Sequence, residues 1–241
     1  MDAINANLQA VKARIARAAA AAGRDANDVA LVAVSKTFDA AAVRAAYAAG
    51  QRAFGENYAQ EALAKMAALA DLSIEWHFIG PIQSNKTRAI AEHFDWAHGV
   101  DRLKIAARLA AARPVGRTPL QVCIEVNLGG ETGKSGVAPE QALTLARAVR
   151  ELPGLRLRGL MAVPPAGGDA AQQRRWFAQL RRLKEEIAAA GIALDTLSIG
   201  MSNDLEAAIA EGATLVRVGT AIFGTRQKPE PQRRRDAEKT L

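Results

Sequence analysis

Eight short apolar segments recur along this chain, and a stretch with helical periodicity follows each of the first seven. The segments span residues 29–36, 52–56, 75–79, 96–100, 120–126, 155–163, 197–201 and 215–219. Strands that alternate with helices form parallel βαβ units, because each helix crosses back over the sheet. Eight strands within about 200 residues predict an α/β fold, a (β/α)8 TIM barrel. An open doubly wound sheet is the alternative.

One further helix is predicted before the first strand. Over residues 2–22, Ile4, Leu8, Val11 and Ile15 recur at spacings of three and four, which is typical of an amphipathic helix. The helices after the strands are expected at about 40–49, 57–70, 84–93, 102–112, 139–151, 170–190 and 202–211, with Ser202 as the cap of the last one. Residues 1–226 are predicted to form a single domain, and the charged tail 227–241 is expected to fray.

Composition narrows the class of protein. The net charge is +7, but three arginines of the excess lie together at residues 233–235 in the tail. No nucleic-acid motif accompanies them, so nucleic-acid binding is not expected. No apolar stretch is long enough to span a bilayer, and the single cysteine, Cys123, cannot form an intrachain disulfide. We expect a cytoplasmic protein with a buried Cys123, without a metal site or a membrane segment.

The first apolar segment ends in Lys36. A charged amine is costly to bury, so a buried lysine tends towards its neutral form, which attacks carbonyls and forms Schiff bases. The simpler interpretation is that Lys36 marks the point where the strand reaches water. In a TIM barrel, however, function lies at the carboxyl ends of the strands, so the ends of the other strands decide between the two.

The last two strands end in segments that suit a phosphate group. Gly200-Met201-Ser202 places a hydroxyl and backbone N–H groups at the expected start of a helix, and Gly219-Thr220 lets the backbone approach a ligand closely. TIM barrels often bind phosphate after strands seven and eight. Asp204 would repel an anion, so we expect it to face away. A helix cap and a turn glycine would look the same in sequence.

Arg217 lies inside the last strand, two residues before Gly219. Alternation places both residues on one face of the strand. If that face is the barrel interior, a permanent cation lies near the phosphate site and Lys36; otherwise Arg217 points outward and pairs with an acidic helix residue. A lysine amine, a phosphate site and a partner for a ring nitrogen are the set that pyridoxal 5′-phosphate (PLP) requires.

Several motifs of this chain together resemble those of the pyridoxal phosphate homeostasis protein family, in order, over about residues 5–226. They are Val34-Ser35-Lys36-Thr37, Phe54-Gly55-Glu56-Asn57, the segment His77–Lys86, Gly159-Leu160-Met161, Gly200-Met201-Ser202-Asn203-Asp204 and the segment Arg217–Gly224. The resemblance implies one barrel similar to the N-terminal domain of alanine racemase, with an extra N-terminal helix.

The resemblance also implies roles for individual residues. Lys36 would carry PLP as an aldimine, and Arg217 would face the pyridine nitrogen. The phosphate would be held by Ser202, Gly219 and Thr220, and the ring would be lined by Asn57 and Met201.

Family members are thought to buffer or deliver PLP, without an established turnover, so no catalytic residue is expected. The partners implied are PLP and apo forms of PLP-dependent enzymes, with the chain itself a monomer. A PLP-dependent amino-acid racemase is the alternative, although its opposite base would have to come from a residue such as Tyr58. A barrel that binds another phosphorylated metabolite is a third possibility. His77 is expected to be a hydrogen-bonded core residue and not a base.

Overall fold

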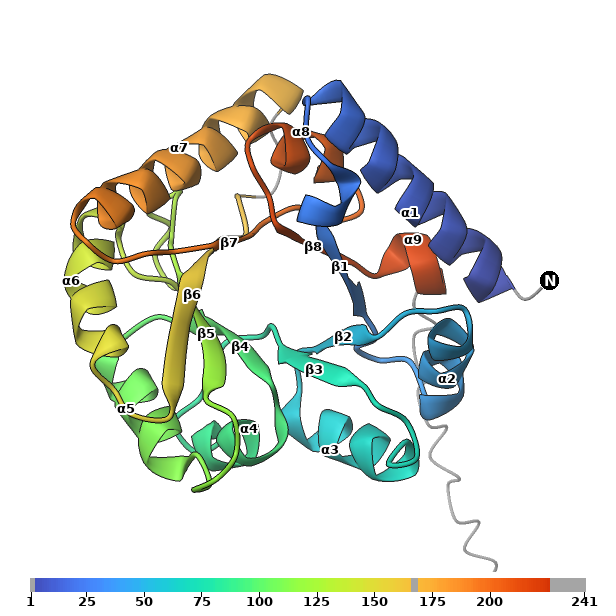
Figure 1. The fold of residues 1–241 in the computed structure, drawn as a ribbon, viewed down its shortest axis with the longest axis horizontal. Helices are drawn as coiled ribbons and strands as arrows, with labels where there is room; N and C mark the ends of the chain where they lie inside the picture. Colours follow the sequence, from blue (N-terminus) through green and yellow to red (C-terminus); the bar gives the residue numbers. More distant parts are fainter. Residues whose placement is uncertain (1–2, 166–168, 226–241) are drawn as a thin grey trace, which may run out of the picture.

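Eight parallel strands close into one barrel, in chain order, in the computed structural model of the chain, which describes residues 3–165 and 169–225 (Figure 1). The strands are β1 (Ala30–Val34), β2 (Ala53–Glu56), β3 (Glu75–Phe78), β4 (Trp96–Val100), β5 (Leu120–Glu125), β6 (Leu155–Met161), β7 (Thr196–Ser198) and β8 (Leu215–Val218). Because β8 pairs with β1, the sheet has no open edge. This closure confirms the predicted TIM barrel and excludes the open sheet.

Helices surround the barrel on its outside (Figure 1). They are α1 (Ala3–Ala21), the 3-10 helix η1 (Ala26–Asp28), α2 (Ala40–Ala48), α3 (Ala59–Ala68), α4 (Thr87–His93), α5 (Leu103–Ala112), α6 (Pro139–Arg150), α7 (Ala170–Ala189), α8 (Leu205–Ala210) and α9 (Thr220–Phe223). The first of them confirms the predicted extra helix. It lies against α8 and α9, beside the place where β8 meets β1.

The prediction was wrong about where the helix after β7 begins. It starts at Leu205, and Ser202 lies in the turn before it, so Ser202 is not its cap. The Oδ1 atom of Asp204 accepts a 2.5 Å hydrogen bond from the backbone N–H of Met201, and this bond closes the turn before the helix can begin. The elements η1 and α9 were not predicted, and the tail 227–241 lies outside the described residues.

Two apolar layers stabilise the barrel. The larger fills the space between the strands and the helices. The smaller lies inside the barrel and consists of Val32, Trp96, Cys123, Met161 and Leu215. Burial raises the pKa of the Cys123 thiol to about 12, as expected for an unreactive core residue.

Polar side chains also lie inside the described part of the barrel, at the positions that alternation along the strands assigns to the interior. They include His77, His98, Ser198 and Arg217, each with at most 5% of its surface exposed. Across residues 3–165 and 169–225, no helix has the length and hydropathy to cross a bilayer, and no cluster of three His, Cys, Asp or Glu side chains could hold a metal ion.

Candidate functional site

A cavity of about 450 Å³ opens at the carboxyl ends of the strands. The structure brings all seven predicted site residues to its wall: Lys36, Asn57, Met201, Ser202, Arg217, Gly219 and Thr220. The wall also includes Val34, Phe38, Ile79, Glu125 and Val163, which the sequence analysis did not assign to the site. The chain therefore gathers residues from the ends of most of its strands at one place.

The backbone on both sides of Lys36 is held by two charged side chains of α3, the buried Lys65 and the partly exposed Glu61. The Ser35 carbonyl accepts a 2.7 Å hydrogen bond from Lys65 Nζ, and the Thr37 N–H donates a 2.6 Å bond to Glu61 Oε1. Thr37 has a φ of +69°, the single positive value among the described non-glycine residues. A β-branched residue in that region is strained, so it persists only where its surroundings fix it.

Lys65, Glu56 and Glu61 form a cluster, here called the ion-pair cluster, behind the site. Lys65 Nζ lies 2.8 Å from Glu56 Oε1 and 2.7 Å from Glu61 Oε1, and the Lys65 side chain is only 6% exposed. The Ser35 hydroxyl donates a 2.6 Å bond to Glu56 Oε1. Burial raises the pKa of Glu56, and the nearby Lys65 ammonium opposes this rise.

The predicted phosphate-binding residues meet where two loops come together. The Ala221 N–H donates a 3.4 Å hydrogen bond to Ser202 Oγ, which joins the loop after β7 to the start of α9. A side chain on Gly219 would come within 3.1 Å of the Val34 carbonyl, so glycine lets the end of β8 lie close to β1. Asp204 is buried and does not line the cavity, in agreement with the prediction that it faces away.

Helix α1 supports both of these loops from outside. Arg14 Nη2 donates a 3.1 Å hydrogen bond to the Ser202 carbonyl, and Arg14 also pairs with Glu206 at 2.9 Å. Asn7 Nδ2 donates a 3.0 Å bond to the Ile222 carbonyl in α9. Arg14 was not predicted as part of the site, because its position on α1 is compatible with any solvated helix face.

Arg217 points into the barrel and reaches the floor of the cavity. It donates hydrogen bonds to the Ser198 carbonyl, to Ser198 Oγ at 2.6 Å and to the Ala162 carbonyl at 3.0 Å. The alternative, an outward arginine paired with a helix acid, is therefore excluded. Burial lowers the pKa of Arg217, and Glu125 opposes this shift, but a guanidinium remains charged at any physiological pH.

Glu125, at the end of β5, is the titratable residue that the sequence analysis missed. Burial, together with the negative charge of Asp101, raises the pKa of Glu125 to about 7, and Arg217 opposes the rise. Its Oε2 atom is buried without a hydrogen-bond partner, as is Oδ1 of Asn57. Both residues line the cavity, so a ligand with hydrogen-bonding groups would satisfy atoms that are otherwise unpaired.

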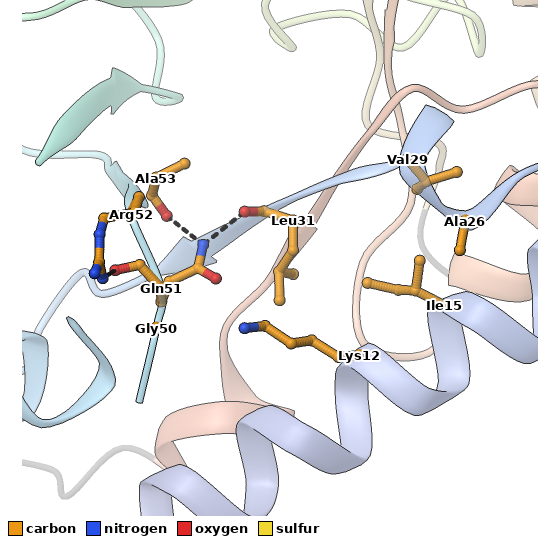
Figure 2. Close-up of a pocket in the computed structure, with 9 residues that line it drawn as sticks. All are labelled: Lys12, Ile15, Ala26, Val29, Leu31, Gly50, Gln51, Arg52 and Ala53. Carbon is orange, nitrogen blue, oxygen red and sulfur yellow. Dashed lines mark hydrogen bonds between the residues drawn. The ribbon is translucent and has the colours of Figure 1, made fainter. Parts of the chain in front are cut away.

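A second cavity, of about 400 Å³, lies on the outside of the barrel between α1 and the start of β2 (Figure 2). Lys12 points towards it, but the Gln51 amide beside it is already bound to the Leu31 and Ala53 carbonyls, at 2.6 and 2.8 Å. The Gln51 side chain thus ties β1 to β2. The strand ends that a TIM barrel uses for binding lie elsewhere, at the first cavity.

The barrel and its site define a class of protein: residues 6–227 match the family model described as "Alanine racemase, N-terminal domain". Within that class, the chain is 61% identical to the pyridoxal phosphate homeostasis protein of Pseudomonas aeruginosa, over 96% of this chain and 99% of that one. It is 49% identical to the protein of the same name from Escherichia coli, over 94% and 98% of the two chains. The chain belongs to the pyridoxal phosphate homeostasis protein family.

Solved structures agree with this assignment. PipY of Synechococcus elongatus, determined with PLP bound, is 41% identical and superposes with a TM-score of 0.80, covering 92% of this chain and 100% of that one. Alanine racemase from Corynebacterium glutamicum is 18% identical with a TM-score of 0.69, and the match covers 93% of this chain but 60% of that one. The second likeness concerns the fold alone.

Proposed function

We propose that this chain binds PLP in the cavity above β1 and β8 and that Lys36 forms the covalent bond to PLP. The chain then serves as a reservoir or donor of the cofactor in the cytoplasm. One observation carries the proposal: Lys36, Arg217 and the Ser202 loop line a single cavity. PLP has an aldehyde, a pyridine nitrogen and a phosphate, and the three features match these three groups.

The other residues of the cavity fit the same ligand. The unpaired oxygens of Asn57 and Glu125 offer hydrogen-bonding atoms to the polar edge of the ring. Ser202, Gly219 and Thr220 would receive the phosphate, while Asn57 and Met201 would line the ring. Bound PLP would supply an electron-accepting ring, but an arginine at the ring nitrogen disfavours protonation there and weakens that capacity.

A carrier suits the described cavity better than a racemase does. Tyr58, the residue considered as an opposite base, is 58% exposed and does not line the cavity. Among the described residues, those that line the cavity include no tyrosine. We therefore propose that apo forms of PLP-dependent enzymes are the partners, and that the chain acts as a monomer.

The direct test is the intact mass of the protein after loading with PLP and reduction with borohydride. We expect the mass to increase by one phosphopyridoxyl group, located on Lys36, and no increase for Lys36→Ala. Lys36→Arg, which keeps a positive charge without a nucleophilic amine, is the matched control and should also remain unlabelled. An unlabelled wild-type protein would overturn the proposal.

The carrier and the racemase are separated by two further measurements. Transfer of PLP to an apo-enzyme faster than spontaneous release supports a donor. Exchange of the α-hydrogen of added amino acids with solvent at catalytic rates, followed by NMR in D2O, would instead identify a racemase.

A further inference from the structure

A continuous line of hydrogen bonds crosses the interior of the barrel and ends on Arg217. His77 Nε2 lies 2.7 Å from Glu75 Oε1, and His77 Nδ1 lies 2.9 Å from His98 Nε2. His98 Nδ1 lies 2.8 Å from Ser198 Oγ, which accepts a 2.6 Å bond from Arg217 Nη1. The four residues Glu75, His77, His98 and Ser198 are here called the relay.

The relay begins at the opposite end of the barrel from the cavity. Glu75 is the first residue of β3, and its side chain is 48% exposed. His77 and His98 are fully buried, and the His77 ring stacks on Trp96 with the ring centres 5.4 Å apart and the planes 11° from parallel. The relay therefore links the amino-terminal face of the barrel to the floor of the cofactor cavity.

The two ends of the relay limit the directions that its hydrogen bonds can take. Arg217 can only donate, so Ser198 Oγ accepts from it and has one proton left to give. The hydrogen bond from His77 lowers the pKa of Glu75, which keeps it a carboxylate that can only accept. Complete burial, together with the nearby His77 ring and the Arg217 guanidinium, lowers the pKa of His98 well below its ordinary value, so His98 is neutral.

With His98 neutral and the Ser198 proton given to it, one arrangement satisfies every member. Ser198 donates to His98 Nδ1, His98 donates from Nε2 to His77, and His77 donates from Nε2 to Glu75. Each hydrogen bond polarises the next in a medium of low dielectric constant. A chain of this kind holds its members in one orientation, and its last member holds the Arg217 guanidinium.

We propose that Glu75, His77, His98 and Ser198 are positioning residues: their relay orients the Arg217 guanidinium and thereby sets how tightly the cavity holds a pyridine ring. This role rests on the proposed function, because the ring nitrogen of PLP is the group that Arg217 would face. None of the four residues lines the cavity, so each acts through Arg217.

Other titratable and charged groups in the described part of the barrel surround the relay. They are Cys123 and Glu125 on β5, Arg158 on β6, whose guanidinium lies 4.8 Å from the Trp96 ring, and Asp204 after β7. Of these, Arg158 helps to lower the pKa of Glu75. The pKa of Arg217 is influenced by Cys123, Glu125 and Asp204. A pH titration must therefore compare matched variants, because the wild-type curve alone contains all of these groups.

The experiment uses two substitutions at opposite ends of the relay and their combination. Glu75→Gln removes a half-exposed charge far from the cavity, and Ser198→Ala interrupts the relay beside Arg217. We expect the dissociation constant for PLP to rise about threefold in Glu75→Gln and about tenfold in Ser198→Ala, the latter matching the loss of one hydrogen bond to a charged group. In the Ser198→Ala background, Glu75→Gln should have no further effect.

A matched control and a second measurement separate positioning from stability. Glu151→Gln removes an exposed carboxylate that pairs with Arg150, and it should leave PLP binding unchanged. Nitrogen NMR of the apo-protein should find the proton on Nε2 of both His77 and His98, with a changed pattern in Glu75→Gln. If Ser198→Ala does not fold, His98→Gln provides the interruption.

The proposal would be overturned by wild-type His98 protonated on Nδ1, or by a Glu75→Gln variant that binds PLP as tightly as the wild type. An effect of Glu75→Gln that is equal in both backgrounds would also overturn it. Each of these outcomes is distinguishable from failure of the proposed function, in which the wild-type protein itself takes up no PLP.

Discussion

Replacement of Lys65 by methionine is the most informative test of how the site is held. The substitution keeps an unbranched side chain of similar length but removes the ammonium group. Lys65 Nζ is bound to the Ser35 carbonyl, Glu56 and Glu61 at 2.7, 2.8 and 2.7 Å, so three acceptors lose their donor together. Two of them, the Ser35 carbonyl and Glu61, hold the backbone beside Lys36.

The size of the expected loss of stability follows from the burial of the ion-pair cluster. Removal of one partner of a buried ion pair leaves an uncompensated charge and costs about 3–5 kcal/mol. Burial already raises the pKa of Glu56, and without Lys65 the pKa rises further, so the folded variant holds a proton on Glu56 that the unfolded chain releases above a pH of about 4.5. The loss of stability should therefore be smallest in acid and grow as the pH rises.

The assay is urea unfolding of the apo-protein at several pH values, followed by tryptophan fluorescence. Arg44→Met is the matched control: Arg44 pairs with Asp71 at 2.7 Å, but both side chains are exposed, and the loss should be too small to measure. Adding Glu56→Gln to Lys65→Met should recover part of the lost stability, because the uncompensated charge is removed.

The same variant should also load PLP more slowly, since the strained backbone at Thr37 loses part of its support. A free energy of unfolding at pH 7 that lies less than about 1 kcal/mol below the wild-type value would contradict the role given to Lys65. A loss of stability that does not increase with pH would contradict the assignment to Glu56.

Three further predictions concern other parts of the molecule. Glu125 has a pKa of about 7 in the folded apo-protein, against an ordinary value of 4.5, so the free energy of unfolding should fall as the pH rises through this interval. Glu125→Gln should abolish that fall and raise the free energy of unfolding by about 3 kcal/mol at pH 8, measured by urea unfolding. The Cys123 thiol, with a pKa of about 12, should react with a chromogenic disulfide only when the chain unfolds, and a fast reaction in native buffer would contradict its burial. Arg14→Met should release PLP several-fold faster by removing the hydrogen bond to the Ser202 carbonyl, while Arg17→Met on the same helix should not.

The sequence was sufficient for the architecture because the barrel repeats one simple pattern eight times. It also placed Lys36 at the end of the first strand and put Arg217 on the same face as Gly219, but left open whether that face is the interior; the family resemblance supplied the roles of both residues. Glu125 lies two residues after the interior residue Cys123, so the same alternation along β5 could have placed it inside the barrel.

The ion-pair cluster and the relay were not predictable in this way. Lys65 lies on α3 and reaches the carbonyl of Ser35, thirty positions earlier in the chain, a contact that only the packing of α3 on the barrel defines. His98 and Ser198 are one hundred positions apart and meet across the interior. A periodic pattern shows which face of a strand or helix is buried, but it does not show which partner each polar atom finds.

The pairing of β8 with β1 has a consequence for when the cofactor can be taken up. Lys36 follows the first strand of the barrel, whereas Arg217 and Gly219 belong to the last. During synthesis the lysine leaves the ribosome long before Arg217 and Gly219, and the sites proposed for the ring and the phosphate do not exist until β8 docks on β1. Loading with PLP must therefore follow closure of the barrel, and a nascent chain arrested before residue 215 would present Lys36 without a pocket around it.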